Sequence, residues 1–524
     1  MTSFRKILTL LLCVGSTSII AQTQAPSPLP LMPLPESVTQ NGQRFVVNKG
    51  FTVSVKTQSQ SRLYSGASRF LRRLSGRTGL FFEQDFLTPV KNPASGSLTV
   101  TNSESPAIAP NIDESYSLKV TSGSIVLDAK TDIGALRGLE TLLQLLNSDT
   151  SGYYFEGVEI KDKPRFTWRG LMLDVARHYM PLEVVRRNLD GMAAMKLNVF
   201  HWHLSEDQGF RVESKKFPKL HELGSDGLYY TQDEIKAIVK YADDRGIRVV
   251  PEFDVPGHST AWFVGYPEYA SAPGPYTIER RWGVFDPTFD PTKEATYKFF
   301  KEFFTEISAL FPDPYFHIGG DENNGKQWNE NSDIQKFMKK NNLPDNHALQ
   351  GYFNNRILEI LTNLNKRMIG WDEILHPSMP KNIVIHSWRG KEALYKSAQQ
   401  GYDGILSNGF YIDLNQSAEF HYKNDPIPAD APLNDTEKAR ILGGEATMWA
   451  ELVTPETVDM KIWTRMPAIA ERLWSPQSVN DVDDMYNRMQ RIWIQLEEHG
   501  LQHMSASEMM FRRMMPGENT NRLV

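Results

Sequence analysis

The sequence predicts an α/β fold, a (β/α)8 TIM barrel preceded by a small α+β domain. Beyond about residue 160 a short apolar strand, usually followed by an amphipathic helix, recurs eight times, which is the number that closes a barrel. All eleven tryptophans stand at or after Trp168, so the composition changes close to the first of these units. The alternative is an open doubly wound sheet, but no glycine-rich phosphate turn follows the first strand.

The first domain, expected over residues 36–160, combines short strands with two helices. Apolar residues at helical spacing predict helices that begin near Leu63 and Ile133. No polar cluster in this region suggests chemistry, so the expected role is structural. Strands are predicted at four apolar stretches, the last two forming a hairpin: Phe45–Val47, Phe51–Val55, Tyr116–Val120 and Ile125–Leu127.

The barrel is expected over residues 161–505, followed by a tail at 506–524. Its strands are short apolar runs, as expected for parallel strands buried on both faces. The connections after the fifth and seventh strands lack a strong helical pattern. Strands are predicted at 168–175, 198–204, 248–255, 315–322, 367–374, 382–388, 403–410 and 441–449. Clear helical patterns occur at 183–196, 232–245, 294–310, 346–364 and 458–472.

Composition and the N-terminus exclude several classes of protein. The net charge of −6 gives no basic excess for binding nucleic acid or an anionic membrane.

Residues 1–21 combine a basic pair, an apolar stretch and a small residue at Ala21, which predicts a signal peptide and export to the periplasm or the cell exterior. A proline-rich lead-in follows at 22–35. The single cysteine lies in the leader, so no disulfide framework is expected. No other apolar run is long enough to span a membrane, and the oligomeric state is not indicated.

Polar and aromatic side chains gather where the predicted strands end. The active site of a barrel lies at the carboxyl ends of its strands. A single acid there is usually a helix cap or part of an ion pair, but all eight ends carry carboxylates or aromatic residues. Tryptophans beside carboxylates suit a sugar, whose ring face stacks while its hydroxyls bind ionised acceptors. In strand order these residues are Asp174 and Arg177, Glu206 and Asp207, Asp254 and His258, Asp321 and Glu322, Trp371 and Asp372, Trp388, Tyr411 and Asp413, and Trp449 and Glu451.

Six segments, taken together, resemble glycoside hydrolase family 20, the β-N-acetylhexosaminidases. They are GALRGLETLLQLL (134–146), RGLMLDVARHY (169–179), HWHLSEDQG (201–209), PEFDVPGH (251–258), HIGGDENNG (317–325) and GWDE (370–373). They occur in the family's order and cover nearly the whole chain after the leader. The resemblance implies an exo-acting, retaining glycosidase that removes terminal β-linked N-acetylhexosamine from glycans and uses neither a metal nor another cofactor.

The resemblance also explains the adjacent acidic pair Asp321-Glu322. Most glycosidases place two carboxyl groups on opposite faces of the sugar, whereas neighbouring residues on a strand point in different directions. In family 20 the 2-acetamido oxygen of the substrate is the nucleophile, and an oxazolinium intermediate forms. The resemblance implies that Glu322 is the general acid/base, that Asp321 orients the acetamido group and that Tyr411 donates a hydrogen bond to its oxygen.

Nine further residues receive supporting roles from the same resemblance. His258 and Glu206 would form a relay behind Glu322, and Asp254 would support Asp321. An acid that works near neutrality needs a raised pKa, which a tryptophan-lined cleft favours for Glu322, whereas Asp321 has to stay ionised. The implied sugar ligands are Arg177 for the 3- and 4-hydroxyls, Asp413 and Glu451 for the 4- and 6-hydroxyls, and Trp371, Trp388 and Trp449 around the acetamido methyl and the ring.

Two positions depart from the family pattern. Many members have aspartate where Glu206 stands, which affects the length of the relay. Some members have a tryptophan where this chain has Asn424. One side of the aglycone region is therefore expected to be more open or to be formed by another loop, such as the one around Trp282.

Two alternative functions stay open. His201 and His203 are one residue apart on a strand, so both rings point to one side, as in a metal-dependent barrel hydrolase. Against this, the pair lies on the second strand rather than the first, the last strand supplies no aspartate ligand, and the HExxH motif is absent. The other alternative is a non-catalytic sugar-binding protein, which would not need the intact pair Asp321-Glu322 or Tyr411.

Overall fold

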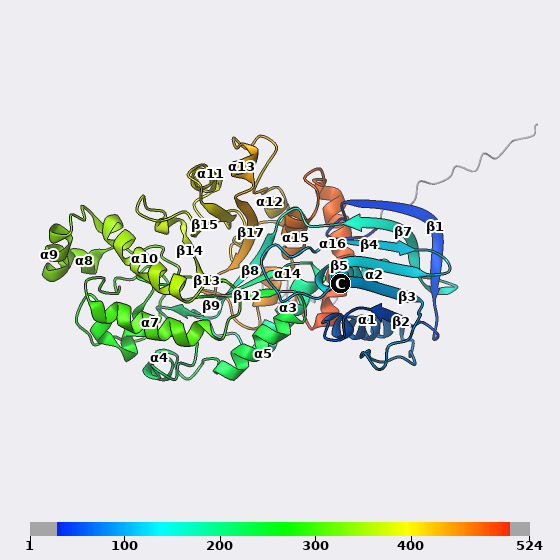
Figure 1. Cartoon of the computed structure of the whole chain (residues 1–524), viewed down its shortest axis with the longest axis horizontal. Helices are drawn as coiled ribbons and strands as arrows, with labels where there is room; N and C mark the ends of the chain where they lie inside the picture. The colour runs from blue at the N-terminus through cyan, green and yellow to red at the C-terminus, as the bar shows by residue number, and fades with distance from the viewer. Residues whose placement is uncertain (1–28, 504–524) are drawn as a thin grey trace, which may run out of the picture.

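The computed structural model describes residues 29–503, which form an N-terminal sheet domain followed by a closed eight-stranded barrel (Figure 1). The predicted fold class is therefore confirmed. The predicted signal peptide, most of the proline-rich lead-in and the predicted tail lie outside the described residues. Within residues 29–503, no helix has both the length and the apolar character needed to cross a membrane.

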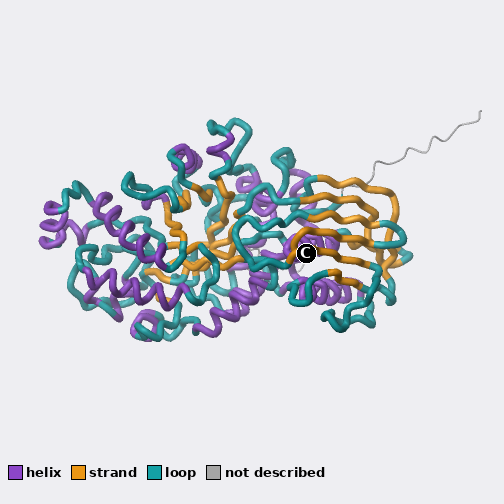
Figure 2. The backbone as a smooth tube through the Cα atoms, viewed as in Figure 1, coloured by secondary structure: helices purple, strands orange, loops and turns teal. Residues whose placement is uncertain are grey.

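The N-terminal domain is a seven-stranded sheet with two helices packed on it, drawn as one layer of strands in Figure 2. Both predicted helices and the predicted hairpin, β4 with β5, are confirmed. The strand order is β1-β7-β4-β5-β3-β2, with β6 paired to β7. The elements are β1 (Ser37–Val47), β2 (Val53–Lys56), α1 (Leu63–Thr78), β3 (Leu98–Glu104), β4 (Tyr116–Val120), β5 (Ile125–Thr131), α2 (Asp132–Gln144), β6 (Leu146–Asp149) and β7 (Gly152–Asp162).

The barrel strands are parallel and close in the order β8-β9-β12-β13-β14-β15-β16-β17. Each of the eight begins within two residues of its predicted start. The short strands β10 (Ser205–Glu206) and β11 (Gly209–Phe210), which follow β9 in the sequence, form a separate hairpin. The barrel strands are β8 (Trp168–Asp174), β9 (Val199–His203), β12 (Arg248–Glu252), β13 (Tyr315–His317), β14 (Arg367–Trp371), β15 (Val384–Ser387), β16 (Asp403–Leu406) and β17 (Ile441–Met448).

The helices cover the outside of the barrel and confirm the predicted pattern, with one correction. The segment predicted as one helix over 458–472 is two, because Pro467 lacks an N–H and stands at the start of the second. The larger helices are α3 (Leu182–Ala194), α5 (Gln232–Asp243), α7 (Glu294–Ser308), α10 (Asn346–Asn363), α11 (Lys391–Gln399), α14 (Val458–Trp463), α15 (Met466–Trp474) and α16 (Val482–Leu496). The shorter ones are α4 (Lys219–Gly224), α6 (Thr260–Gly265), η1 (Pro267–Tyr269), α8 (Lys326–Glu330), α9 (Ser332–Lys340), η2 (Asp372–Ile374), α12 (Ala418–Tyr422), α13 (Asp435–Lys438) and η3 (Glu497–His499).

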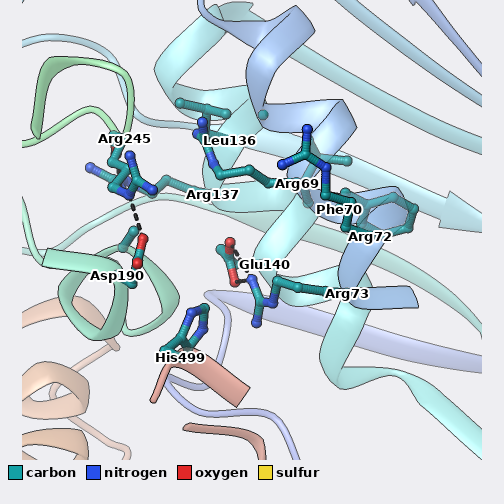
Figure 3. Close-up of a pocket in the computed structure, with 13 residues that line it drawn as sticks. Arg69, Phe70, Arg72, Arg73, Leu136, Arg137, Glu140, Asp190, Arg245 and His499 are labelled. Carbon is teal, nitrogen blue, oxygen red and sulfur yellow. Dashed lines mark hydrogen bonds and ion pairs between the residues drawn. The ribbon is translucent and has the colours of Figure 1, made fainter. Parts of the chain in front are cut away.

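Buried ion pairs join the two domains. Glu114 of the first domain accepts bonds from Arg137 of α2 at 2.8 Å and from Arg169 of β8 at 2.7 Å. Asn198, just before β9, donates a further bond to Glu114 at 3.0 Å. None of these three charged side chains is more than 5% exposed. A cavity also lies in this interface (Figure 3).

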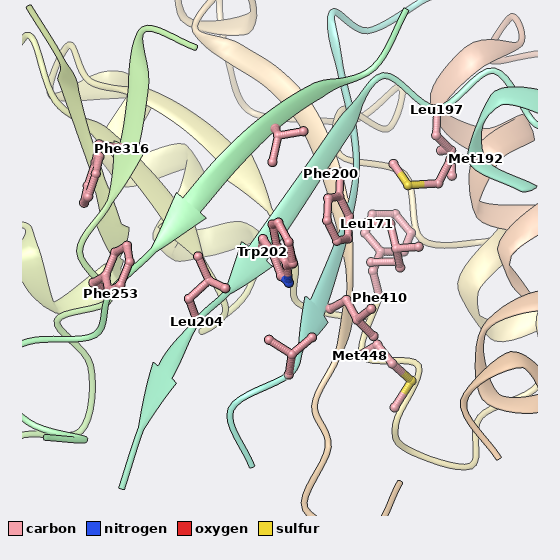
Figure 4. Close-up of a cluster of buried hydrophobic side chains, with 14 of the residues drawn as sticks. Leu171, Met192, Leu197, Phe200, Trp202, Leu204, Phe253, Phe316, Phe410 and Met448 are labelled. Atoms are coloured by element: carbon pink, nitrogen blue, oxygen red, sulfur yellow. The ribbon is translucent and has the colours of Figure 1, made fainter. Parts of the chain in front are cut away.

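The main apolar core lies between the barrel strands and the surrounding helices. Along β9 the side chains alternate, as the period of two requires. Phe200 and Trp202 join this core, and Figure 4 shows them beside Leu171 of β8. His201 and His203 instead contact Glu252 inside the barrel. One strand thus supplies both outer apolar packing and an inner polar network.

Replacing Glu114 with Gln should destabilise the protein by about 3–5 kcal/mol, because it leaves two buried guanidinium groups without their counter-charge. Urea denaturation of the wild type and the variant measures the loss. Glu159→Gln, at an exposed carboxylate on β7, is the matched control and should leave the midpoint unchanged. An unchanged midpoint for Glu114→Gln would show that the ion pairs of Glu114 do not stabilise the protein.

Candidate active site

The twelve predicted site residues all lie at the carboxyl end of the barrel, on strand ends or on the loops that follow. Hydrogen bonds, ion pairs, ring contacts and electrostatic coupling link them into one cluster. From β8 to β17 they are Arg177, Glu206, Asp254, His258, Asp321, Glu322, Trp371, Trp388, Tyr411, Asp413, Trp449 and Glu451.

A glycine turn delivers the acidic pair. The strand β13 ends at His317 rather than at residue 322 as predicted, because Gly319 and Gly320 adopt φ angles of +66° and +92°, outside the extended region. A Cβ at Gly319 would lie 1.9 Å from Asp254 Oδ1. The N–H of Gly320 donates to that same oxygen at 2.9 Å. The turn therefore depends on glycine and fixes Asp254 behind the pair.

Asp321 and Glu322 do not diverge as neighbours on a strand would. His258 Nε2 lies 4.0 Å from Asp321 Oδ2 and 3.7 Å from Glu322 Oε2. Glu322 itself has φ +47° and His258 φ +49°, both in the left-handed region. Such backbone conformations are costly for residues other than glycine and are concentrated at functional sites. The loop geometry thus brings both carboxylates to one imidazole.

His258 is held on its other side by Glu206. His258 Nδ1 lies 3.1 Å from Glu206 Oε2, and Glu206 Oε1 lies 2.5 Å from a guanidinium nitrogen of Arg177. Burial opposes charge on His258, but the Glu206 carboxylate outweighs it and raises the pKa of His258 well above its ordinary value. Glu206, which stands where many family members have the shorter aspartate, therefore contacts the histidine directly.

The acidic groups titrate in the opposite order to the sequence expectation. His258, whose Nε2 lies 3.7 Å from Oε2 of Glu322, lowers the pKa of Glu322, whose side chain is 41% exposed. Burial raises the pKa of Asp321 to about 7, and the carboxylate of Glu373 adds to this. Burial and the neighbouring Asp321 raise the pKa of Asp254 well above its ordinary value. The prediction of a raised pKa for Glu322 is thus wrong here, because a cation lies beside it.

Arg177 is the cation next to the acidic cluster. It bonds to Asp174 Oδ2 at 3.0 Å and lies 3.7 Å from Glu451 Oε1. Its guanidinium carbon stands 4.9 Å from the ring centre of Trp449. Burial raises the pKa of Glu451, and burial raises that of Asp413 to about 6. A hydroxyl group can donate a hydrogen bond to one of these acids and accept one from the buried arginine. The arrangement therefore suits a ligand that is rich in hydroxyl groups.

An aromatic wall stands beside the acids. Trp371 and Trp449 form a buried cluster with Met172, and Trp388 and Tyr411 pack against it. The rings of Trp371 and Trp449 are 5.7 Å apart and inclined at 46°. Burial raises the pKa of Tyr411 well above its ordinary value, as does the charge of Asp321, so Tyr411 keeps its proton and can donate it in a hydrogen bond.

Trp282 and Asn424 lie on the connections that follow β12 and β16. Trp282 is 72% exposed. Its loop is held to the Glu206 segment because Glu279 N–H donates to Asp207 O at 3.1 Å. Asn424 instead donates to Asn408 O at 2.8 Å. The exposed tryptophan therefore lies on a loop anchored beside the relay.

Sequence reasoning missed the supports beneath the site. Trp371 Nε1 donates to Glu252 Oε1 at 2.9 Å, and Trp388 Nε1 donates to Glu373 Oε2 at 3.1 Å. Glu252 and Glu373 stand inside the motifs PEFDVPGH and GWDE, so the signal was present. However, their roles depend on contacts with other strands, which no local pattern reveals.

The histidine pair of the metal-hydrolase alternative points to one side, as its spacing predicts, but into the barrel. His201 lies 2.6 Å from Glu445 and 3.0 Å from Glu252, and His203 lies 2.5 Å from Glu252. Nitrogens of His201, His317 and His386 come within 4.8 Å of one another. A catalytic metal keeps an open position for water and substrate, whereas these histidines are at most 1% exposed. The arrangement is that of a buried polar network.

A (β/α)8 barrel whose carboxyl end carries clustered acids, an arginine and a tryptophan wall defines a glycoside hydrolase. The sequence pattern of the glycosyl hydrolase family 20 catalytic domain matches residues 166–477, and that of family 20 domain 2 matches residues 29–163. The chain belongs to glycosyl hydrolase family 20.

Relatives agree with this placement. A β-hexosaminidase of Porphyromonas gingivalis is 32% identical over 95% of this chain and 67% of its own length. The crystal structure of a chitobiase from Flavobacterium johnsoniae is 51% identical, with a TM-score of 0.91 over 94% of this chain and 76% of that one. An exo-β-N-acetylglucosaminidase of Vibrio harveyi, solved with N-acetylglucosamine, is 31% identical, with a TM-score of 0.78 over 90% and 78%.

If Asp321 acts as a carboxylate, kcat/KM should fall as the pH drops through about 7, because Asp321 then becomes protonated. Glu373→Gln should move this acid limb to lower pH, since it removes a charge that raises the pKa of Asp321. The pH dependence of kcat/KM on an aryl β-N-acetylglucosaminide measures both effects. Glu392→Gln, at an exposed acid on α11, is the control and should leave the limb in place. An unmoved limb in Glu373→Gln would refute the coupling.

Proposed function

We propose that this chain is an exo-acting β-N-acetylhexosaminidase in which Glu322 is the general acid/base and Asp321 and Tyr411 position the 2-acetamido group. The observation that supports these roles is that two adjacent carboxylates approach the same nitrogen of His258, at 4.0 and 3.7 Å. The carboxyls of other retaining glycosidases flank the bond that is cleaved. An adjacent pair suits a reaction in which the substrate supplies its own nucleophile.

In the first step Glu322 transfers its proton to the glycosidic oxygen. The bond from C1 to that oxygen breaks, and the acetamido oxygen bonds to C1, which gives the oxazolinium ion. A sugar bound over the half-exposed Glu322 displaces water. The loss of water raises the pKa of the Glu322 carboxyl group toward the value that a general acid needs. Asp321, in its ionised form, accepts a hydrogen bond from the acetamido N–H and stabilises the developing positive charge.

In the second step Glu322 takes a proton from water, whose oxygen attacks C1 and opens the oxazolinium ring. Two inversions at C1 give net retention. His258, held by Glu206, stays beside Glu322 and stabilises its carboxylate between the two steps. Tyr411 hydrogen-bonds the acetamido oxygen, and the tryptophan wall packs against the methyl group and the ring.

The substrate class follows from the relatives and from the site. The Flavobacterium relative is described as a chitobiase and the Vibrio relative as an exo-β-N-acetylglucosaminidase. For this chain we infer cleavage of a terminal, non-reducing β-linked N-acetylhexosamine from a glycan. The leader at residues 1–21 supports export to the periplasm or the cell exterior, which cell fractionation tests.

Glu322→Gln should lower kcat on the p-nitrophenyl β-N-acetylglucosaminide by about 10²-fold or more, because the amide cannot protonate the leaving oxygen. The loss should be smaller on the 2,4-dinitrophenyl glycoside, whose leaving group needs less protonation. The difference between the two substrates separates lost acid catalysis from misfolding.

Equal losses on both glycosides, or near-wild-type turnover, would overturn the acid role of Glu322. Loss of wild-type activity in a chelator, restored by zinc, would instead favour the metal-dependent alternative.

Asp321→Asn should impair hydrolysis of the aryl β-N-acetylglucosaminide and β-N-acetylgalactosaminide by about 10²-fold or more, since it removes the charge that opposes the oxazolinium cation. Turnover of the matching β-glucoside, which lacks the acetamido group, should be low in the wild type and should not fall further in the variant. Steady-state kinetics on this panel measure the effect and also give the preferred sugar. Full activity on the acetamido substrates would refute the orienting role.

A further inference from the structure

A cavity of about 190 Å³ lies between the two domains, away from the candidate active site. Its walls come from α1 and α2 of the first domain, from α3, and from His499 of η3. Arg245, which precedes β12, places it at the amino end of the barrel strands. The acids of the active site stand at the carboxyl end, and in barrels the amino end serves stability.

Arginines dominate the lining, and most of them are paired. Arg73 contacts Glu140 and Glu498, each at 2.6 Å. Arg245 contacts Asp190 at 2.5 Å. Figure 3 shows Arg73, Glu140, Arg245 and Asp190 around one space, with the pairs Arg73–Glu140 and Arg245–Asp190 dashed. The two carboxylates of the lining are therefore already neutralised.

Arg69 is the exception among the partly buried arginines of the cavity. Its hydrogen bond goes to the backbone oxygen of Asp244 at 2.7 Å, and no carboxylate of residues 29–503 forms an ion pair with it. Burial and the neighbouring Arg245 lower the pKa of Arg69 to about 10, and they outweigh the charges of Glu140, Asp190 and Asp244, which act in the opposite direction. Buried charges in proteins are normally paired, and within residues 29–503 this cation has acids nearby but none in direct contact.

We propose that the cavity binds a tetrahedral oxyanion, inorganic phosphate or sulfate, with Arg69 as its principal ligand. Arg245 bonds through Nε and Nη1 to Asp190 and to the Tyr241 carbonyl, which leaves its Nη2 for the anion. Guanidinium forks match the spacing of oxyanion oxygens. The volume accommodates such an ion together with a few waters. The anion would join α1 of the first domain to the barrel.

Calorimetric titration tests the proposal directly. Phosphate, and separately sulfate, is added to the purified chain in a chloride buffer of matched ionic strength, and the wild type should show saturable binding with one site. Arg69→Gln keeps an amide that can still bond the Asp244 carbonyl but removes the charge, and it should weaken binding at least tenfold. Arg186→Gln, at an exposed arginine on α3 without an ion pair in the described part of the chain, removes the same charge and should bind as the wild type does.

Thermal unfolding supplies a second measurement. Phosphate at ten times its Kd should raise the Tm of the wild type and of Arg186→Gln by about 1 °C, but not that of Arg69→Gln. Turnover of the aryl glycoside by Arg69→Gln should equal that of the wild type. No saturable binding to the wild type, or binding by Arg69→Gln as tight as that of the wild type, would overturn the proposal.

Discussion

The buried carboxylate of Glu252 is the constraint on which the barrel interior and the site above it depend. A charge that deep is tolerated only when donors surround it, because an uncompensated buried charge costs several kcal/mol. His203 and Trp371 bond to Glu252, and His201 lies 3.0 Å from it. Since Trp371 belongs to the aromatic wall, this requirement fixes the orientation of a ring that faces the site. The packing inside the barrel therefore also positions the aromatic wall of the candidate site.

The fold, and the gathering of the predicted site residues at one end of the barrel, could be predicted from sequence because both depend on local patterns. Apolar runs located the barrel strands, and acids or aromatic residues at their ends located the site. The end of β13 could not be predicted, because the turn at Gly319 is shaped by its contact with Asp254 on another loop. The order of titration was missed for a similar reason: it depends on His258 lying beside Glu322 and on Glu373 lying near Asp321.

Stability and chemistry occupy opposite ends of the barrel. At the amino end, Glu114 and its arginines bind the first domain, and the arginine-lined cavity lies in the same interface. At the carboxyl end, acids of raised pKa and left-handed backbone make the structure locally less favourable. The first domain thus contributes none of the twelve site residues, but it helps to stabilise the barrel that carries them.

The left-handed backbone at Glu322 has a consequence for how a proton can be exchanged. In the proposed reaction Glu322 gives up a proton and later takes one back, and a strong partner would favour one of these two protonation states. Here the turn through Gly319 and Gly320 sets the direction of the side chain, and His258 Nε2 stands 3.7 Å from its carboxylate. The main chain therefore sets the position of the carboxyl group, while His258 favours its ionised form, so displacement of water by a bound sugar has to raise its pKa before it can act as an acid.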